Sequence, residues 1–185
     1  ISFYCLTFEE NTPILEREVP VGEEKEAEFL LKGWELLNTL GYNHYEVSNF
    51  SKVGEECLHN EVYWNLGQYI GIGPTAESAL GWNEMTVMRN TESLEEYFDT
   101  HAFNVSSLTK EETEESYLLT TLRTKKGIDK DEYRERFGKD FDSTYQERIH
   151  LLDKETYINS DTNFSVSEKG MLTLDYIILT LSMSI

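Results

Sequence analysis

The sequence predicts an α+β protein in two parts. The first fifty residues contain two apolar segments with an amphipathic helix between them, and this order predicts a βαβ unit with parallel pairing. From Thr109 onward the pattern is helical, with a single hairpin. The composition changes at about residues 102–108, where we expect a linker, so the predicted domains cover residues 1–105 and 106–185.

The first part is predicted from its pattern of apolar residues. Residues 1–8 are an almost unbroken apolar, aromatic and β-branched run, which is typical of a strand covered on both faces. A helix is expected from about residue 23 to residue 40, with Gly41 as its stop, and a second strand over residues 45–50. The apolar positions of the helix recur at helical spacing: Ala27, Leu30, Leu31, Trp34 and Leu37.

A glycine-containing loop follows a predicted strand at residues 69–72. Residues 71–76 satisfy the G-x-G-x-x-A pattern of dinucleotide-binding proteins. The next element, at about residues 78–90, is predicted to be a strand, so no helix N-terminus is available to hold a pyrophosphate. We therefore reject dinucleotide binding, although such glycines let the backbone approach a small ligand closely.

The second part is predicted from helix caps and one turn. Thr109 and Glu112 form a capping box that opens the first helix, and Asp129 opens a second helix that stops at Gly138. A third helix is expected at about residues 141–152, followed by a hairpin over 157–166 and a last helix over 168–181. Three helices, a hairpin and a helix resemble a winged-helix arrangement.

Charge and cysteine content exclude several classes of protein. The formal net charge is −19, which disfavours nucleic acid and anionic membranes as partners. No apolar run reaches the ~20 residues of a membrane span, and no signal peptide is visible. Cys5 and Cys57 cannot form a disulfide framework or a metal cluster, and they fit a reducing cytosol. We expect a cytoplasmic fragment of a longer protein.

The residues 59–64 form the candidate ligand site. On a helix, His59 and Tyr63 are neighbours, as are Asn60 and Trp64, so the segment offers an imidazole, an amide and two aromatic planes to a flat ligand or an iron atom. The alternative is that these side chains pack in the core and hold the preceding loop. The sequence identifies no catalytic residue and no metal site.

Several segments, in order, resemble the oxygen-independent coproporphyrinogen III oxidase-like radical SAM family. They are Ile1–Pro13, Tyr45–Lys52, Glu56–Asn60, Tyr63–Trp64, Tyr69–Gly73, Ala76–Ser78, Leu122–Thr124, Gly127–Ile128 and Ser167–Gly170. The resemblance implies the C-terminal part of a partial (β/α) radical SAM barrel with its connecting region, followed by a HemN-type C-terminal helical, winged-helix-like domain. The H-N-x-x-Y-W stretch resembles the haem-chaperone (HemW-like) branch of the family.

The resemblance also implies roles for particular residues. His59 becomes the candidate haem contact, with Asn60, Tyr63 and Trp64 around it. The residues implied to face S-adenosylmethionine are Thr7, Thr75, Ala76 and Glu77. Glu77 stands where the family often has histidine. The three-cysteine motif for a 4Fe-4S cluster lies in the missing half of the barrel, so neither cofactor is expected to be held tightly here.

Three functions remain open at this point. The chain resembles the C-terminal half of a haem chaperone, which binds haem and delivers it to acceptor proteins. The alternatives are the C-terminal half of an oxygen-independent coproporphyrinogen III oxidase that acts in porphyrin biosynthesis, and a non-catalytic interaction module. The implied partners are haem or porphyrin and the missing N-terminal half of the barrel. His59 in H-N-x-x-Y-W favours the chaperone over the oxidase.

Overall fold

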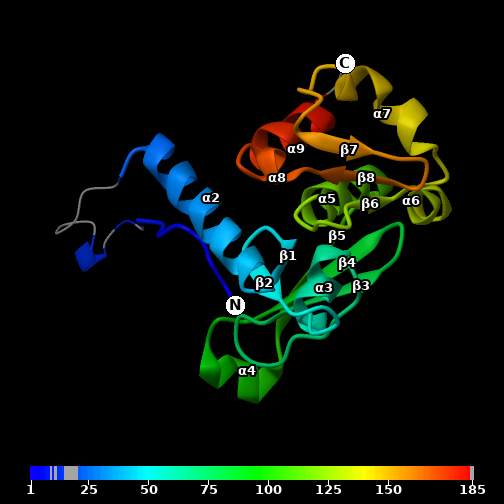
Figure 1. Ribbon diagram of the computed structural model, residues 1–185. Helices are drawn as coiled ribbons and strands as arrows, with labels where there is room; N and C mark the ends of the chain where they lie inside the picture. Colours follow the sequence, from blue (N-terminus) through cyan, green and yellow to red (C-terminus); the bar gives the residue numbers. More distant parts are fainter. Residues whose placement is uncertain (9, 11, 15–20, 184–185) are drawn as a thin grey trace. The chain divides into compact units, whose positions relative to one another are not determined.

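The computed structural model describes residues 1–8, 10, 12–14 and 21–183. The chain divides into two compact units, residues 1–57 and 58–185, which are described separately below (Figure 1). Glu9 and Asn11, which belong to the first segment of the family resemblance, lie outside the described residues.

The first unit contains one helix and one hairpin. Helix α2 covers Glu23–Thr39, as predicted, and strands β1 (Asn43–Glu46) and β2 (Asn49–Ser51) pair antiparallel. The predicted strand at residues 1–8 is wrong: within it, Ser2 alone forms a bridge, to Asn49. That bridge is antiparallel, so the predicted parallel βαβ pairing is also wrong. The reason is the tight turn after Glu46, which folds residues 43–51 back on themselves.

The core of the first unit is a small aromatic cluster. Trp34 of α2 is 2% exposed, and its ring lies 4.8 Å from that of His44 in β1. The His44 imidazole in turn stacks on Phe50 of β2 at 4.3 Å. The cluster fixes the helix against the hairpin.

The second unit begins with a helix and an antiparallel sheet. Helix α3 covers Leu58–Trp64 and helix α4 covers Leu94–Thr100. The sheet has the order β3 (Glu77–Gly81), β4 (Met85–Asn90) and β5 (Phe103–Ser107). In the predicted strand 69–72, Tyr69 alone pairs, with Ala79.

Residues 103–107 do not form a linker, because they pair with β4 along their whole length as β5 (Figure 1). Their alternation of apolar Phe103 and Val105 with polar Asn104 and Ser106 is that of a strand. The boundary predicted between residues 105 and 106 falls inside this strand.

The rest of the second unit is helical with a second small sheet. Helices α5 (Lys110–Thr121), α6 (Lys130–Phe137) and α7 (Phe141–Ile149) lie close to their predicted positions. The sheet has the order β6 (Ile128–Asp129), β8 (Asn163–Val166) and β7 (Tyr157–Asn159), and β7 and β8 are the predicted hairpin. The winged-helix description stays a prediction.

The predicted last helix is two helices, α8 (Glu168–Met171) and α9 (Leu174–Ser182). They separate because the Thr173 amide donates to the carbonyl of Gly170, a tighter bond than the helical one. Helix α9 packs against α5 and α7. Within the described ranges, no helix is long and apolar enough to cross a membrane.

Candidate functional site

Helix α3 carries the residues that the sequence singled out, so the condition under which His59 and Tyr63 become neighbours is met. His59 is exposed, and its ring meets Tyr63 edge-on at 4.7 Å between centroids. The i, i+4 spacing therefore produces the predicted contact.

Tyr63 continues into a row of side chains that reaches the glycine loop. Its ring meets Tyr69 at 4.5 Å, and the Tyr69 hydroxyl donates to the Glu77 carboxylate at 3.4 Å. Burial, followed by the nearby charge of Glu77, raises the pKa of Tyr69. We call His59, Tyr63, Tyr69 and Glu77 the His59 row. It places a residue predicted for haem and one predicted for S-adenosylmethionine at two ends of one contact chain.

Sequence reasoning missed Tyr69, although it quoted the residue within a family motif. No sequence pattern signals its contact, because Tyr69 joins the row through the antiparallel pair that it forms with Ala79, in which the two backbones exchange hydrogen bonds of 2.9 and 3.0 Å. This pair lays the chain after α3 alongside β3 and brings Tyr69 to Glu77.

Trp64 lies toward α5 rather than in the His59 row. The hydroxyl of Thr121 in α5 donates to the Trp64 carbonyl at 3.3 Å, and the guanidinium of Arg123 lies 5.9 Å from the Trp64 ring. The Trp64 indole N–H is buried and has no hydrogen-bond partner within the described residues. Asn60 is half-buried. The four predicted haem residues therefore do not share one contact cluster.

The C-terminal end of α3 is a Schellman motif. Gly67 donates its amide to the carbonyl of Val62 at 2.7 Å, and Leu66 donates to Tyr63 at 3.0 Å. Leu66 takes the left-handed conformation, with φ at 47°, a position that glycine usually occupies. A leucine there requires support from the surrounding structure.

The loop carrying Thr75, Ala76 and Glu77 is held by hydrogen bonds between its backbone and neighbouring segments. The Gly73 amide donates to the Tyr97 hydroxyl at 3.0 Å, and the Asn90 side chain donates to the Gly73 carbonyl at 2.9 Å. The amides of Thr75 and Ala76 are also engaged, by the carbonyls of Thr91 and Gly73. These amides are thus already bonded, and the Thr75 hydroxyl and the Glu77 carboxylate remain as the polar side chains of the loop. Thr7, the fourth residue predicted for S-adenosylmethionine, is exposed in the first unit.

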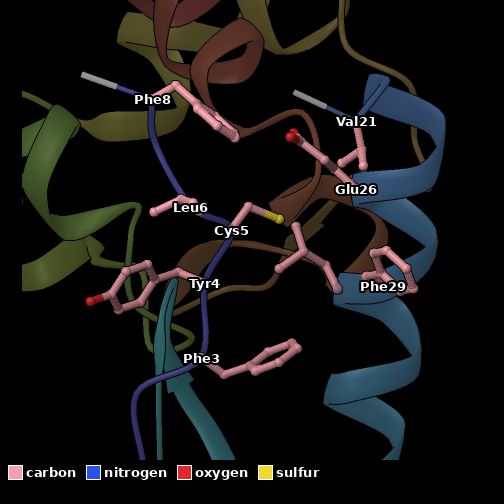
Figure 2. A pocket seen from close by; sticks show the side chains of 9 residues that line it. Phe3, Tyr4, Cys5, Leu6, Phe8, Val21, Glu26 and Phe29 are labelled. Carbon is pink, nitrogen blue, oxygen red and sulfur yellow. The ribbon is translucent and has the colours of Figure 1, made fainter. Parts of the chain in front are cut away.

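A pocket of about 530 Å³ lies inside the first unit, between residues 3–8 and α2 (Figure 2). Figure 2 shows Phe3 and Cys5 pointing toward α2, whereas Tyr4 and Leu6 point away from it. The lining is apolar apart from Glu26 and the Cys5 thiol, whose pKa is raised by burial and by the charge of Glu26. The pocket contains none of the predicted site residues.

The chain's own residues do not fit an iron–sulfur cluster. A 4Fe-4S cluster is held by cysteine thiolates, usually four, and the sequence has Cys5 and Cys57 alone. Across residues 1–8, 10, 12–14 and 21–183, no three His, Cys, Asp or Glu side chains gather as metal ligands would.

Comparison with known proteins identifies the class. Residues 108–173 match the HemN C-terminal domain, and these residues contain α5 to α8. The solved structure of coproporphyrinogen III oxidase HemN from Escherichia coli, titled a radical SAM enzyme, superposes with a TM-score of 0.64. That match covers 88% of this chain and 42% of the other at 14% identity, so it concerns the fold.

Curated relatives show which proteins of this class the chain is similar to. The chain is 27% identical over 181 residues to the Heme chaperone HemW of Buchnera aphidicola from Schizaphis graminum, covering 95% of this chain and 48% of the relative. The Bacillus subtilis Heme chaperone HemW is 30% identical over 159 residues, with coverages of 81% and 41%. The chain is thus similar to Heme chaperone HemW proteins, contains a match to the HemN C-terminal domain, and corresponds to the C-terminal half of such proteins. It spans about half the length of the curated relatives it matches.

Proposed function

We propose that this chain is the haem-contacting C-terminal half of a haem chaperone, with His59 as the residue that meets the iron. The observation that supports this most is the exposed His59 imidazole, backed by Tyr63 on α3, in a chain homologous to proteins named Heme chaperone HemW. A neutral imidazole is a good axial ligand for haem iron. Haem is the cargo in this proposal, and its delivery to an acceptor protein follows from the same homology.

A haem titration of the full chain tests the proposal. The His59→Ala variant should bind haem more weakly and shift the Soret band, because it lacks an iron ligand. The fold should be unaffected, since His59 is exposed. His150→Ala is the matched control, because His150 is also exposed but caps α7. If all three proteins titrate alike, haem binds non-specifically to apolar surface, and the segment has a packing role alone.

We further propose that S-adenosylmethionine and a 4Fe-4S cluster belong to the full-length protein, with the cluster outside these 185 residues. The family relationship supports both cofactors, and the two cysteines of this chain fit no cluster. The loop residues Thr75, Ala76 and Glu77, together with Thr7, are our candidates for the S-adenosylmethionine contact. A reducing, cytoplasmic location is consistent with the two free cysteines.

The partner of the first unit is, in this proposal, the N-terminal half of the same kind of protein. Tyr4 is 70% exposed and Leu6 56%, and the pocket beside them is apolar. We expect the chain to co-purify with a separately expressed N-terminal half of a HemW relative. A Tyr4→Asp, Leu6→Asp double variant should lose that association while a Leu94→Asp control, at an exposed position in α4, retains it. Equal recovery with the wild type and the double variant would contradict this assignment.

A further inference from the structure

Arg136 of α6 is a buried cation whose counter-charge is not a carboxylate. Its side chain is 1% exposed, and no ion pair to it exists within the described residues. Burying a guanidinium is costly unless its donors are satisfied. The groups that satisfy them therefore indicate why an arginine is placed here.

The guanidinium donates to three backbone carbonyls from two distant segments. Nε donates to Trp82 at 2.6 Å, Nη1 to Asn65 at 3.3 Å and Nη2 to Leu66 at 3.1 Å. The same group lies 4.6 Å from the Trp82 ring centroid, a cation–π contact. Asn65 and Leu66 end α3, and Trp82 lies in the turn between β3 and β4.

The end of α3 depends on these bonds. A helix leaves its last carbonyls without partners, and the Schellman motif satisfies those of Val62 and Tyr63. The next carbonyl, of Trp64, is satisfied by Thr121, and the following two by Arg136. All three acceptors are thus served by side chains of the HemN C-terminal domain. A seven-residue helix would be marginal without them.

Arg136 also reaches both ends of the His59 row. Through Asn65 and Leu66 it holds the helix that carries His59 and Tyr63. Through Trp82 it holds the β3–β4 hairpin, whose first residue is Glu77. One side chain therefore fixes the two elements between which the row is formed.

We propose that Arg136 is a positioning residue: from the HemN C-terminal domain it fixes the end of α3 against the β3–β4 hairpin and so sets the geometry of the His59 row. The proposal rests on the proposed haem function for its functional consequence, but the positioning of α3 is testable without haem.

Three variants of the full chain test it. Arg136→Met keeps the aliphatic length and removes every donor, and Arg136→Lys keeps the charge with a smaller reach. Ile149→Ala is the control for general destabilisation, because Ile149 is buried in α7, which packs against α6 and α9. Hydrogen exchange of the amides at residues 62–67 is measured under conditions in which all proteins are equally folded, and haem is titrated in parallel.

For Arg136→Met we expect exchange at residues 62–67 to rise about tenfold or more, as the loss of charge-assisted hydrogen bonds implies. Haem affinity should fall and the Soret band should move toward that of His59→Ala. Arg136→Lys should lie between this variant and the wild type. Ile149→Ala should unfold more easily yet leave both the exchange at 62–67 and the Soret band unchanged.

Unchanged exchange at residues 62–67 in Arg136→Met would overturn the proposal. If that variant does not fold, wild-type exchange in Arg136→Lys with a lowered unfolding temperature would overturn it too, because Arg136 would then stabilise the chain without fixing α3. Faster exchange together with a His59→Ala variant that binds haem normally would support the positioning of α3 and contradict the proposed haem function, so the two failures are distinguishable.

Discussion

Glu114 is a buried carboxylate that joins three helices. It lies in α5 and is 5% exposed, and it accepts hydrogen bonds from Tyr133 of α6 and from Tyr145 of α7, the latter at 2.8 Å. Lys139, in the turn between α6 and α7, donates at 2.5 Å. Burial acts to raise the pKa of Glu114, but the hydrogen bonds from Lys139, Tyr133 and Tyr145 together outweigh it and hold the pKa below the ordinary 4.5.

Glu114→Gln should lower the unfolding free energy by about 1–3 kcal/mol at neutral pH, since one charged acceptor of three donors is lost. Because the folded-state pKa is depressed, the stabilisation is present above the unfolded-state value and is lost as the pH falls through the folded-state value. Denaturant unfolding is measured between pH 7 and pH 3. The gap in unfolding free energy between wild type and variant should close below about pH 4.5. Glu111→Gln, at an exposed position on the same helix, should show no such gap. A gap that persists at acid pH would contradict this account.

The candidate site shows which residue contacts can be predicted from sequence. The contact of His59 with Tyr63 follows from helical spacing alone, and it was predicted. Tyr69 joins the row through a pairing across the glycine loop, and Arg136 reaches α3 from about seventy residues away. Neither contact is local, so no periodicity in the chain signals it.

At the scale of elements, helix caps were easier to predict from the sequence than the pairing of strands. Thr109 and Asp129 each begin a helix as predicted, because a cap depends on three or four neighbouring residues, and Ser167 caps α8 in the same way. The parallel βαβ unit was wrong because a strand-like composition does not specify its partner. The change in composition at residues 102–108 predicts a linker, but residues 103–107 pair with β4 as strand β5. Both errors concern which segments pair, which depends on the whole unit.

Helix α8 depends on a glycine that touches the backbone of another segment. A methyl group on Gly170 would lie 2.0 Å from the carbonyl oxygen of Thr156 and 2.7 Å from a methyl of Val166. The Gly170 amide also donates to the side chain of Ser167, the cap of this helix, at 3.1 Å. The Ser-Glu-Lys-Gly stretch is therefore explained by a cap and by close packing.

Gly170→Ala should lower the unfolding free energy by about 1–3 kcal/mol through overpacking, although alanine favours helices more than glycine does. Lys169→Ala on the same turn should cost at most about 1 kcal/mol, because it removes only exposed ion pairs. Chemical denaturation of both variants checks that Gly170→Ala loses more unfolding free energy than Lys169→Ala. A Gly170→Ala variant as stable as the wild type would show that the Thr156 segment can move away.

At the scale of the whole molecule, charge argues against the DNA binding that the predicted winged-helix arrangement would suggest. The net charge of −19 opposes phosphate contact, and α7, which would be the recognition helix in that prediction, carries Asp142 and Glu147 against Arg148. Lys130 does not offset this, because its ammonium is engaged by Asp142 at 2.6 Å.

We therefore expect no salt-sensitive binding to duplex DNA at physiological ionic strength, measured by fluorescence anisotropy with a labelled duplex. Any phosphate contact would have to overcome long-range repulsion, which salt weakens, so residual binding should not decrease with added salt. Micromolar binding that falls steeply with salt would show a basic surface that the sequence does not predict. Haem, with its apolar ring, can be titrated in the same buffer as a positive control for ligand binding.

The support of α3 by distant side chains also has a consequence for the order of folding. The carbonyls that end this helix accept hydrogen bonds from Thr121 and Arg136, which lie 57 to 71 residues further along the chain. A seven-residue helix does not persist alone, so α3 acquires its lasting structure only after the helices that follow it have docked. During synthesis, the His59 imidazole is made early but is positioned late. In a nascent chain, the α3 face that we propose for haem would thus be ordered only after α6 has left the ribosome.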